Sequence, residues 1–221
     1  MRKDEENCLH MKRGSIYMKL YILRHGQTPW NTKKRMQGQT DILLNEKGIR
    51  LAEETGRGMK DIDIDLVISS PLLRARQTAE LVMAGRSIPL ITDRRIMEMS
   101  FGDWEGESFL DSKVLPPEFI DQFYHDPFHA AKPPKGESFQ ELVERLAGFY
   151  RSIAGNEAYR DKNILISTHG AASRALLMNF YEDKEDFWRG GVPKNCAVTI
   201  VNVENGIGTV EELDKIFYKE V

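Results

Sequence analysis

The sequence predicts an α/β protein: a three-layer α/β/α sandwich with a mainly parallel sheet and an inserted cap region. Short apolar runs that suit buried strands alternate with helical patterns, which is typical of a parallel sheet covered on both faces. The chain has 221 residues, of which 41% are hydrophobic, enough for one large domain or one domain with an insertion. Between residues 103 and 137 the alternation stops, and this break marks the expected insertion.

Apolar runs of strand length predict the sheet. They lie at residues 19–23, 62–68, 88–91, 163–167 and 197–203, with 208–212 as the return strand of a hairpin. In a parallel sheet, ligands gather beyond the carboxyl ends of the strands. The residues that directly follow these runs are therefore the first candidates for a functional site.

Helices are predicted over about residues 46–60, 71–84, 138–154 and 171–181, and the polar segment 27–44 is expected to be a loop with at most one helical turn. Capping residues support the first three helices. Asn45 suits the N-cap of the first, and Ser70 with Pro71 suits the start of the second. Ser138 and Glu141 fit the capping-box pattern of the third.

The irregular segment 103–137 carries five of the nine prolines, together with many aromatic residues. We interpret it as a lid or cap inserted into the domain rather than as a layer of the core. The domain is expected to span residues 18–221. Residues 1–17 are predicted to form a mobile tail, with Met11 and Met18 as alternative start sites.

Composition and charge narrow the possible partners. The net charge of −3 gives no general attraction to nucleic acid or to a membrane surface, so an anionic ligand needs a local cationic pocket. No apolar stretch approaches the ~20 residues of a membrane-spanning helix, and residues 1–12 lack the apolar centre of a signal peptide. Cys8 and Cys196 suit free thiols in a reducing compartment. A cytoplasmic location is expected, and no oligomeric state is predicted.

Two histidines follow predicted strands, and a glycine follows each of them. His25 stands between Arg24 and Gly26 after the first strand, and His169 precedes Gly170 after the fourth. An imidazole in this position can attack phosphorus, and a neighbouring guanidinium can hold phosphoryl oxygens with paired hydrogen bonds. Either histidine alone also suits a purely structural role, but two strand-ending His-Gly pairs indicate a shared site.

Charged residues follow the other two parallel strands. Arg74 and Arg76 fall in the first turns of a predicted helix, where the partial positive charge also favours an anion, and Arg74 lies nearer the strand end. Glu98 follows the third strand and is a candidate general acid, with Asp103 and Glu105 as competitors on spacing alone. Each of these charges taken singly also suits an exposed surface position.

The chain resembles the histidine phosphatase superfamily, which includes the cofactor-dependent phosphoglycerate mutases, over about residues 18–203. Five blocks, beginning with Arg24-His25-Gly26, carry the resemblance in the family's order and spacing: residues 24–31, 37–41, 69–78, 98–106 and 167–170. The fold of that family, a three-layer α/β/α sandwich, agrees with the pattern of strands and helices. Leu43 and Leu51 depart from the residues that many members carry, and both are expected to lie outside the pocket.

The resemblance implies a role for each matching position. His25 matches the nucleophile that forms a phosphohistidine, and Glu98 matches the acid that protonates the leaving alkoxide and then helps water attack. The phosphate-pocket residues are matched by Arg24, Arg74 and His169, and positions near the bound phosphate by Thr28, Asn31, Gln37, Gly38 and Gly170. The arginines are expected to favour the neutral form of His25. Because the cations are built into the chain, neither a metal nor a cofactor is expected.

The implied activity is that of a metal-independent, histidine acid-type phosphatase, and the expected partner is a small phosphorylated metabolite. Gln27 and Thr28 stand where phosphoglycerate mutases usually carry Glu and Ser, and those mutases are generally longer in the cap and at the C-terminus. Mutase-type phosphoryl transfer is therefore the alternative. A binding module without catalysis is less favoured, because all five catalytic positions are matched.

Two features of the predicted cap have weaker functional interpretations. His125 and His129 are four residues apart, but Pro127 interrupts a helix between them, so a metal site is not expected. The aromatic residues of the cap are expected to pack mainly against one another. Phe123 and Tyr124 are candidates for contact with the substrate.

Overall fold

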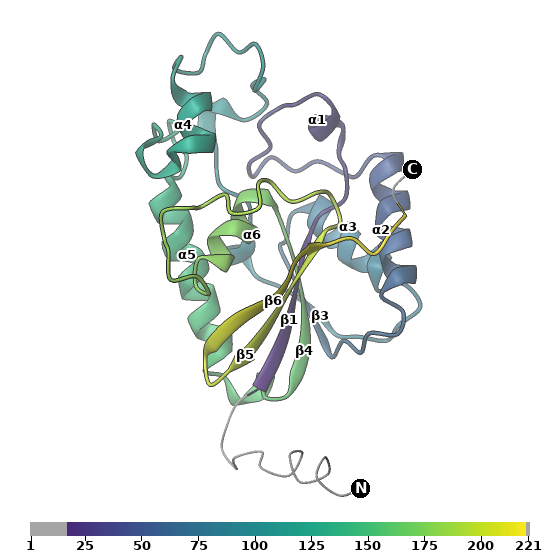
Figure 1. Ribbon diagram of the computed structural model, residues 1–221. Coiled ribbons are helices and arrows are strands. Elements are labelled where there is room, and N and C mark those ends of the chain that lie inside the picture. Colours follow the sequence, from purple (N-terminus) through teal and green to yellow (C-terminus); the bar gives the residue numbers. More distant parts are fainter. Residues whose placement is uncertain (1–16, 220–221) are drawn as a thin grey trace, which may run out of the picture.

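The computed structural model describes residues 17–219, in which a six-stranded sheet forms the middle layer (Figure 1). The strands are β1 (Tyr17–Arg24), β2 (Leu66–Ser69), β3 (Leu90–Thr92), β4 (Lys162–Thr168), β5 (Val198–Glu204) and β6 (Ile207–Lys215). Their order across the sheet is β3-β2-β4-β1-β5-β6. β1 to β4 are mutually parallel, β5 is antiparallel to β1, and β6 is antiparallel to β5. The predicted mainly parallel sheet is confirmed, although β2 and β3 begin later than expected.

Helices cover both faces of this sheet. They are α1 (Pro29–Thr32), α2 (Glu46–Gly58), α3 (Leu73–Val82), α4 (Phe119–His125), α5 (Phe139–Ala154) and α6 (Gly170–Leu177), with 3₁₀ turns η1 (Arg94–Ile96), η2 (Gly102–Trp104), η3 (Pro127–His129) and η4 (Glu157–Tyr159). In Figure 1, α2 and α3 lie on one side of the strands, and α5 and α6 lie on the other. All four predicted helices are present, with α6 ending earlier than expected.

The central strand β1 supplies side chains to two separate apolar cores. Leu20 and Ile22 are buried with residues of α5 and α6, whereas Tyr21 and Leu23 are buried with residues of α2 and α3. Successive side chains of a strand point to opposite faces of the sheet, so a continuous apolar run serves both layers. This arrangement confirms the three-layer α/β/α sandwich.

Two helices begin where their capping residues predict. The side chain of Asn45 accepts a hydrogen bond from the backbone N–H of Gly48 at 2.8 Å. At the start of α5, Ser138 and Glu141 form both hydrogen bonds of a capping box. These local hydrogen bonds satisfy N–H groups that have no partner within the helix, which explains why both starts were predictable.

The start of α3 differs from the prediction. The helix begins at Leu73 and not at Pro71, and the backbone N–H of Leu73 donates to Asp41 Oδ1 at 2.7 Å. Ser70 was expected to cap this helix, but its hydroxyl lies 2.8 Å from His169 Nε2. The prediction was wrong because a carboxylate from a distant loop binds the helix start, while the serine faces the interior.

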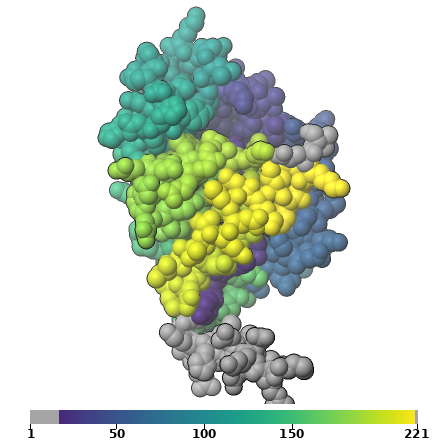
Figure 2. Space-filling view, in the orientation of Figure 1, coloured from purple at the N-terminus to yellow at the C-terminus, as the bar shows by residue number. Residues whose placement is uncertain are grey.

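The predicted cap, residues 103–137, contains α4 and η3 and lies at the top of the molecule, above α5 (Figures 1 and 2). Its inner side chains belong to the main core, because Trp104, Phe119 and Phe123 are buried in the cluster that includes α5 and α6. The indole N–H of Trp188 donates to the carbonyl of Phe123 at 2.6 Å. This hydrogen bond joins the predicted cap to the loop that follows α6.

Residues 1–16 lie outside the described residues, and with them almost all of the predicted tail and Cys8. Tyr17, which was assigned to that tail, is the first residue of β1. Cys196 is a free, buried cysteine. None of the helices within residues 17–219 combines the length and apolar character needed to cross a membrane.

Candidate active site

Strand register brings the two predicted histidines together. Arg24 at the end of β1 is paired with Thr168 at the end of β4, so His25 and His169 leave neighbouring strands side by side. The backbone N–H of His25 donates to the carbonyl of Thr168 at 3.0 Å. The two imidazole centroids are 5.2 Å apart, which places both rings at one point of the carboxyl edge.

The hydrogen bond made by His25 determines which of its ring nitrogens can react. Nδ1 lies 2.7 Å from the carbonyl oxygen of Gly26, so the neutral ring carries its proton on Nδ1 and a lone pair on Nε2. Burial lowers the pKa of His25 well below its usual value, and the charges of Arg74 and Arg24 lower it further. The ring is neutral, as expected, but burial contributes more to this than the arginines do.

Two glycines allow α2 to dock directly behind His25. A Cβ on Gly26 would lie 2.7 Å from the carbonyl oxygen of Gly48, and a Cβ on Gly48 would lie 2.1 Å from that of Gln27. Neither position accepts a side chain unless the backbone moves. The glycine of the Arg-His-Gly triplet is thus required for close packing of the backbone against a helix.

His169 is fully buried and is held by Ser70. Its Nε2 lies 2.8 Å from Ser70 Oγ. The same hydroxyl oxygen accepts a hydrogen bond from the backbone N–H of Leu72 at 3.3 Å. A serine hydroxyl in this position can donate its proton to Nε2, which leaves the proton of the neutral ring on Nδ1. Burial lowers the pKa of His169 well below its usual value, and Arg74 and His25 add to the effect.

The two predicted arginine clamps are held by backbone carbonyl groups; Arg74 is buried and Arg24 is half-buried. Arg24 donates to the carbonyl of Pro193, and Arg74 donates to those of Gly38 at 2.6 Å and Thr40 at 3.0 Å. Burial lowers the pKa of Arg74 to about 10 and also lowers that of Arg24. With a pKa of about 10, Arg74 still carries its charge at neutral pH.

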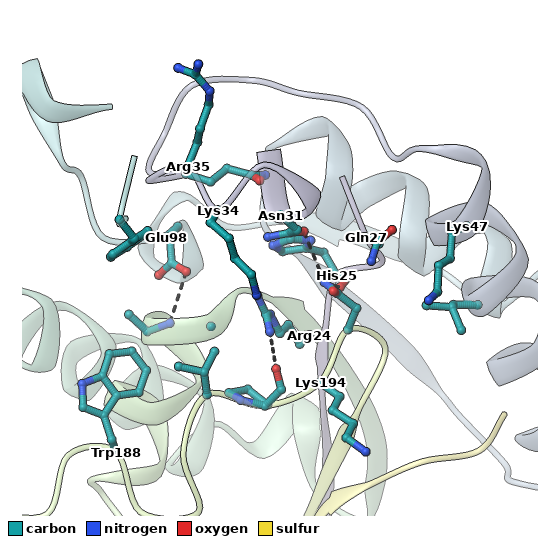
Figure 3. Close-up of a pocket in the computed structure, with 18 of the residues that line it drawn as sticks. Arg24, His25, Gln27, Asn31, Lys34, Arg35, Lys47, Glu98, Trp188 and Lys194 are labelled. Atoms are coloured by element: carbon teal, nitrogen blue, oxygen red, sulfur yellow. Dashed lines mark hydrogen bonds between the residues drawn. The ribbon is translucent and has the colours of Figure 1, made fainter. Parts of the chain in front are cut away.

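The carboxyl group of Glu98 lies at the N-terminus of α6. Its oxygens accept from the backbone N–H groups of Ala172 at 2.9 Å and Ala171 at 3.2 Å (Figure 3). A Cβ on Gly170 would lie 3.6 Å from Glu98 Oε2 and 3.7 Å from Arg24 Nε. The carboxyl group and the guanidinium therefore meet at the start of this helix, beside the histidine pair.

The sequence left one alternative open for the arginine of α3 and two for the general acid. None of these three residues lines the cavity at His25. Arg76 and Asp103 are exposed and form ion pairs on the surface. Glu105 accepts from the backbone N–H groups of Gln39 at 2.7 Å and Thr40 at 2.6 Å. Its oxygens are thus engaged in fixing the loop whose carbonyl groups hold the buried arginine of α3.

Of the remaining predicted residues, Asn31, Gln37 and Gly170 line the cavity at His25, whereas Thr28 and Gly38 do not line it and instead hold residues of the site. Thr28 is buried; its hydroxyl donates to Gln37 Oε1 at 2.5 Å, and its backbone N–H donates to Asn31 Oδ1 at 3.0 Å. The sequence did not predict Asn195, whose Nδ2 donates to the carbonyl of His25 at 3.0 Å. Thr28 therefore orients the side chains of Asn31 and Gln37, and Asn195 fixes the backbone at His25.

Four buried nitrogen atoms of the described residues have no hydrogen-bond partner: Arg24 Nε, Gln37 Nε2, Arg74 Nε and His169 Nδ1. All four belong to residues that were predicted for one phosphate pocket. Buried polar groups are almost always hydrogen-bonded, and each unpaired one costs about 1–3 kcal/mol. An anion with several oxygen atoms can accept from such donors, so the four nitrogens suit the binding of an oxygen-rich anion.

A cavity of about 990 Å³ opens in front of His25 and Glu98 (Figure 3). Much of its wall was not predicted, namely Lys34, Lys47, Arg50 and Leu51 on the side of α1 and α2, and Trp188, Val192, Lys194 and Asn195 in the loop after α6. The expectation that Leu51 lies outside the pocket was wrong. Residues 47, 50, 51 and 54 share one face of α2, and this helical spacing was the missed signal. Leu43 is an exposed residue.

Within residues 17–219, no group of three or more His, Cys, Asp or Glu side chains is arranged to hold a metal ion. His125 and His129 each hydrogen-bond an aspartate, at 2.9 Å and 2.7 Å. These two histidines are exposed on the cap.

The fold and the buried cationic pocket define an α/β protein with a site suited to an oxygen-rich anion. The chain belongs to the histidine phosphatase superfamily (branch 1), whose family pattern matches residues 20–215. The family predicted from the motifs is therefore confirmed.

Relatives of this chain include proteins named as phosphatases and as mutases. A Bacillus subtilis (strain 168) protein named uncharacterized phosphatase PhoE is 36% identical over 181 residues, which cover 82% of each chain. The probable phosphoglycerate mutase GpmB of Erwinia tasmaniensis is 35% identical over 185 residues, covering 84% of this chain and 85% of that one. The solved structure of Bacillus stearothermophilus YhfR matches with a TM-score of 0.83 at 32% identity, covering 90% of this chain and 98% of that one.

We expect the free energy of unfolding to fall as the pH drops below about 6.5, the ordinary histidine pKa. The reason is that the unfolded chain takes up protons on His25 and His169, whose lowered pKa values keep the folded rings neutral. Urea unfolding between about pH 7.5 and pH 5.5 measures this change. The double variant His25→Asn/His169→Asn should lose less stability over that range, and equal losses in the two proteins would contradict the expectation.

Proposed function

We propose that this protein is a metal-independent phosphomonoester hydrolase that acts through a phosphohistidine intermediate on His25, with Glu98 as general acid and base. The observation that carries the proposal is the set of four unpaired buried nitrogen atoms in the pocket of the histidine pair. Membership in the histidine phosphatase superfamily supports it. The proposal includes a small phosphorylated metabolite as substrate and a cytoplasmic location, in keeping with the free thiol of Cys196.

In the first step, Nε2 of His25 attacks the phosphorus atom of the bound ester. The new N–P bond forms as the bond between phosphorus and the leaving oxygen breaks, and Glu98 gives its proton to the departing alkoxide. The hydrogen bond from Nδ1 to the carbonyl of Gly26 supports this step because it keeps the lone pair on Nε2. The lowered pKa of His25 supports it as well, since a protonated ring has no lone pair to give.

The buried nitrogen atoms hold the phosphoryl oxygens during transfer. Arg24 and Arg74 supply positive charge, and His169 supplies an N–H from Nδ1. Arg74 and His169 are buried, and fixed charges and dipoles with little access to solvent stabilise a developing negative charge more strongly than they would in water. Gln37, held by Thr28, supplies a further N–H, and the carbonyl of Gly38 keeps Arg74 in place.

In the second step, a water molecule attacks the phosphohistidine. Glu98 takes the proton of the water, the N–P bond breaks, and inorganic phosphate leaves with His25 restored. Glu98 then carries the proton that the next cycle needs. The hydrogen bonds that Glu98 accepts from Ala171 and Ala172 hold its carboxyl group in place beside the histidine pair for this transfer.

Phosphoglycerate mutase-type transfer is the second candidate function, favoured by the 35% identity to a relative named as a phosphoglycerate mutase. The two functions share the phosphohistidine and differ in what receives its phosphoryl group. A phosphatase delivers the group to water, whereas a mutase returns it to a phosphoglycerate.

We expect His25→Ala to lower kcat for p-nitrophenyl phosphate by at least about 10³-fold, because the variant lacks the nucleophile. Wild-type protein quenched during turnover should contain an acid-labile phosphohistidine that the variant does not form. His129→Ala, which changes an exposed histidine of the cap, should keep wild-type activity. Substantial turnover by His25→Ala would rule out the mechanism.

Transfer to water should exceed transfer to a phosphoglycerate. With 3-phosphoglycerate and a bisphosphoglycerate primer, we expect release of inorganic phosphate to be at least about tenfold faster than formation of 2-phosphoglycerate. Colorimetric phosphate assay and NMR of the phosphoglycerates measure the two rates in one sample. Faster exchange than release would assign the protein to the mutase function.

We expect two neighbouring aromatic residues of the proposed cap to have different roles: Phe123 stabilises the fold, and Tyr124 contacts the substrate. Phe123 also lines the cavity but is only 4% exposed, and Phe123→Ala is expected to lower the free energy of unfolding by about 3 kcal/mol. Tyr124 is 42% exposed at the cavity, and Tyr124→Ala should change the preference for aromatic over aliphatic phosphomonoesters by about threefold. Thermal melting and kcat/KM on matched substrates test this, and an unchanged preference in Tyr124→Ala would contradict it.

A further inference from the structure

The segment that carries Glu98 has no regular secondary structure of its own. Residues 97–100 lie between η1 and η2, and none of them belongs to a strand or a helix. Met97 and Glu98 are nevertheless buried. Backbone carbonyl groups that are removed from solvent need hydrogen-bond partners, and a segment without a ladder must find them elsewhere. Contacts from other parts of the fold therefore fix the position of Glu98.

Arg145 of α5 supplies most of these partners. Its guanidinium donates to the carbonyl of Arg95 at 2.7 Å, to that of Met97 at 2.9 Å and to that of Glu98 at 3.3 Å. The remaining carbonyl of this stretch accepts a hydrogen bond from a hydroxyl group of β4 at 2.8 Å. Every backbone carbonyl from Arg95 to Glu98 is thus bound by a side chain, and one arginine binds three of the four.

Glu137 fixes the guanidinium of Arg145 in this orientation. Its two carboxylate oxygens accept from Nε and Nη2 of Arg145 at 2.7 Å and 2.6 Å, the paired geometry that suits an arginine and a carboxylate. The two side chains are only 20% and 14% exposed. Together with the carbonyl contacts, this ion pair engages all five N–H groups of the guanidinium. Arg145 therefore has no N–H left for a ligand, and it does not line the cavity.

Glu98 is consequently held at both ends. Its backbone carbonyl accepts from Arg145 and also from Gln39 Nε2 at 3.1 Å. Its carboxyl group accepts from Ala171 and Ala172 at the start of α6. Proton transfer requires hydrogen-bond distance between the acid and the leaving oxygen, and a displacement of about 1 Å can cost about 10²-fold in rate. Release of the backbone end would allow such a displacement.

We propose that Arg145 is a positioning residue for Glu98, which it holds through residues 95–98 at the distance from the leaving oxygen that proton transfer requires. The inference rests on the proposed function, because it takes Glu98 as the general acid. A good leaving group departs without a proton, so loss of this positioning should slow esters of alcohols more than esters of acidic phenols. A purely structural defect would slow both kinds of ester alike.

The test compares two esters with the same aromatic ring. p-Nitrophenyl phosphate releases an acidic phenol, whereas p-nitrobenzyl phosphate releases an alcohol that needs the proton of Glu98. In Arg145→Lys, which keeps the charge but not the planar fork, kcat/KM should fall about tenfold for p-nitrobenzyl phosphate and at most about twofold for p-nitrophenyl phosphate. We use kcat/KM because it covers the steps up to departure of the leaving group. An equal fall for the two esters would overturn the proposal.

Two further variants separate positioning from a loss of stability. Glu137→Gln keeps the arginine but removes the charge that orients it, and it should show the same selective loss at about threefold. Ile153→Ala removes a buried side chain near the end of α5 and should leave the ratio of the two esters unchanged. Thermal melting gives the stability of each variant. A ratio that falls with stability in all of them, Ile153→Ala included, would contradict the proposal.

A double variant shows whether Arg145 acts through Glu98. Glu98→Gln alone should lose activity selectively with p-nitrobenzyl phosphate, because its amide cannot give the proton. Adding Arg145→Lys to Glu98→Gln should then change the ratio of the two esters no further. A further selective loss in the double variant would mean that Arg145 acts by another route.

Hydrogen exchange separates failure of this inference from failure of the proposed function. If Glu98→Gln slows both esters alike, or if neither ester is hydrolysed by the wild type, the proposed function fails. The backbone N–H groups of Ala171 and Ala172 donate to Glu98, so they report its position without any assay of activity. By NMR, both should exchange about tenfold faster in Arg145→Lys than in the wild type and no faster in Ile153→Ala. Equal exchange in Arg145→Lys and the wild type would refute the positioning role.

Discussion

The removal of two guanidinium groups from solvent at the carboxyl edge of the sheet, complete for Arg74 and partial for Arg24, is the constraint on which the rest of the site depends. Arg24 and Arg74 are held by neutral carbonyl oxygens, and a buried charge is costly unless such partners are fixed in place. Two remote residues fix them. Glu105 accepts hydrogen bonds from the loop around Thr40, and Arg174 holds the loop that contains Pro193. The pocket is therefore a product of tertiary contacts as much as of strand ends.

The same burial gives the two histidines different tasks without a change of residue type. Both pKa values are lowered, so both rings are neutral and each has one nitrogen with a proton and one without. The partner on the inner side decides which nitrogen faces the pocket. A carbonyl behind His25 exposes a lone pair, whereas the Ser70 hydroxyl behind His169 leaves an N–H. In the proposed mechanism, the lone pair of His25 supports attack on phosphorus, and the N–H of His169 supports binding of the phosphoryl oxygens.

The parts of the structure that the sequence predicts are those set by neighbouring residues. The apolar run at residues 19–23 and the caps at Asn45 and Ser138 are local patterns, and each produced the expected element. The start of α3 was missed because Asp41, a long way back in the chain, binds it. Asn195 was missed for the same reason, since its contact with His25 spans most of the chain. No local pattern encodes such contacts.

The two faces of α2 have a consequence for which substitutions this chain can accept. The face that contains Gly48 and Ala52 packs into the fold, so changes there disturb the backbone behind His25. The face that contains Lys47, Arg50 and Leu51 borders the cavity, and of these three residues only Leu51 packs against the core. Mutations on this second face can alter which compounds enter while the reacting groups stay in place. Within one helix, the residues that stabilise the fold are thus separate from most of those that face an incoming ligand.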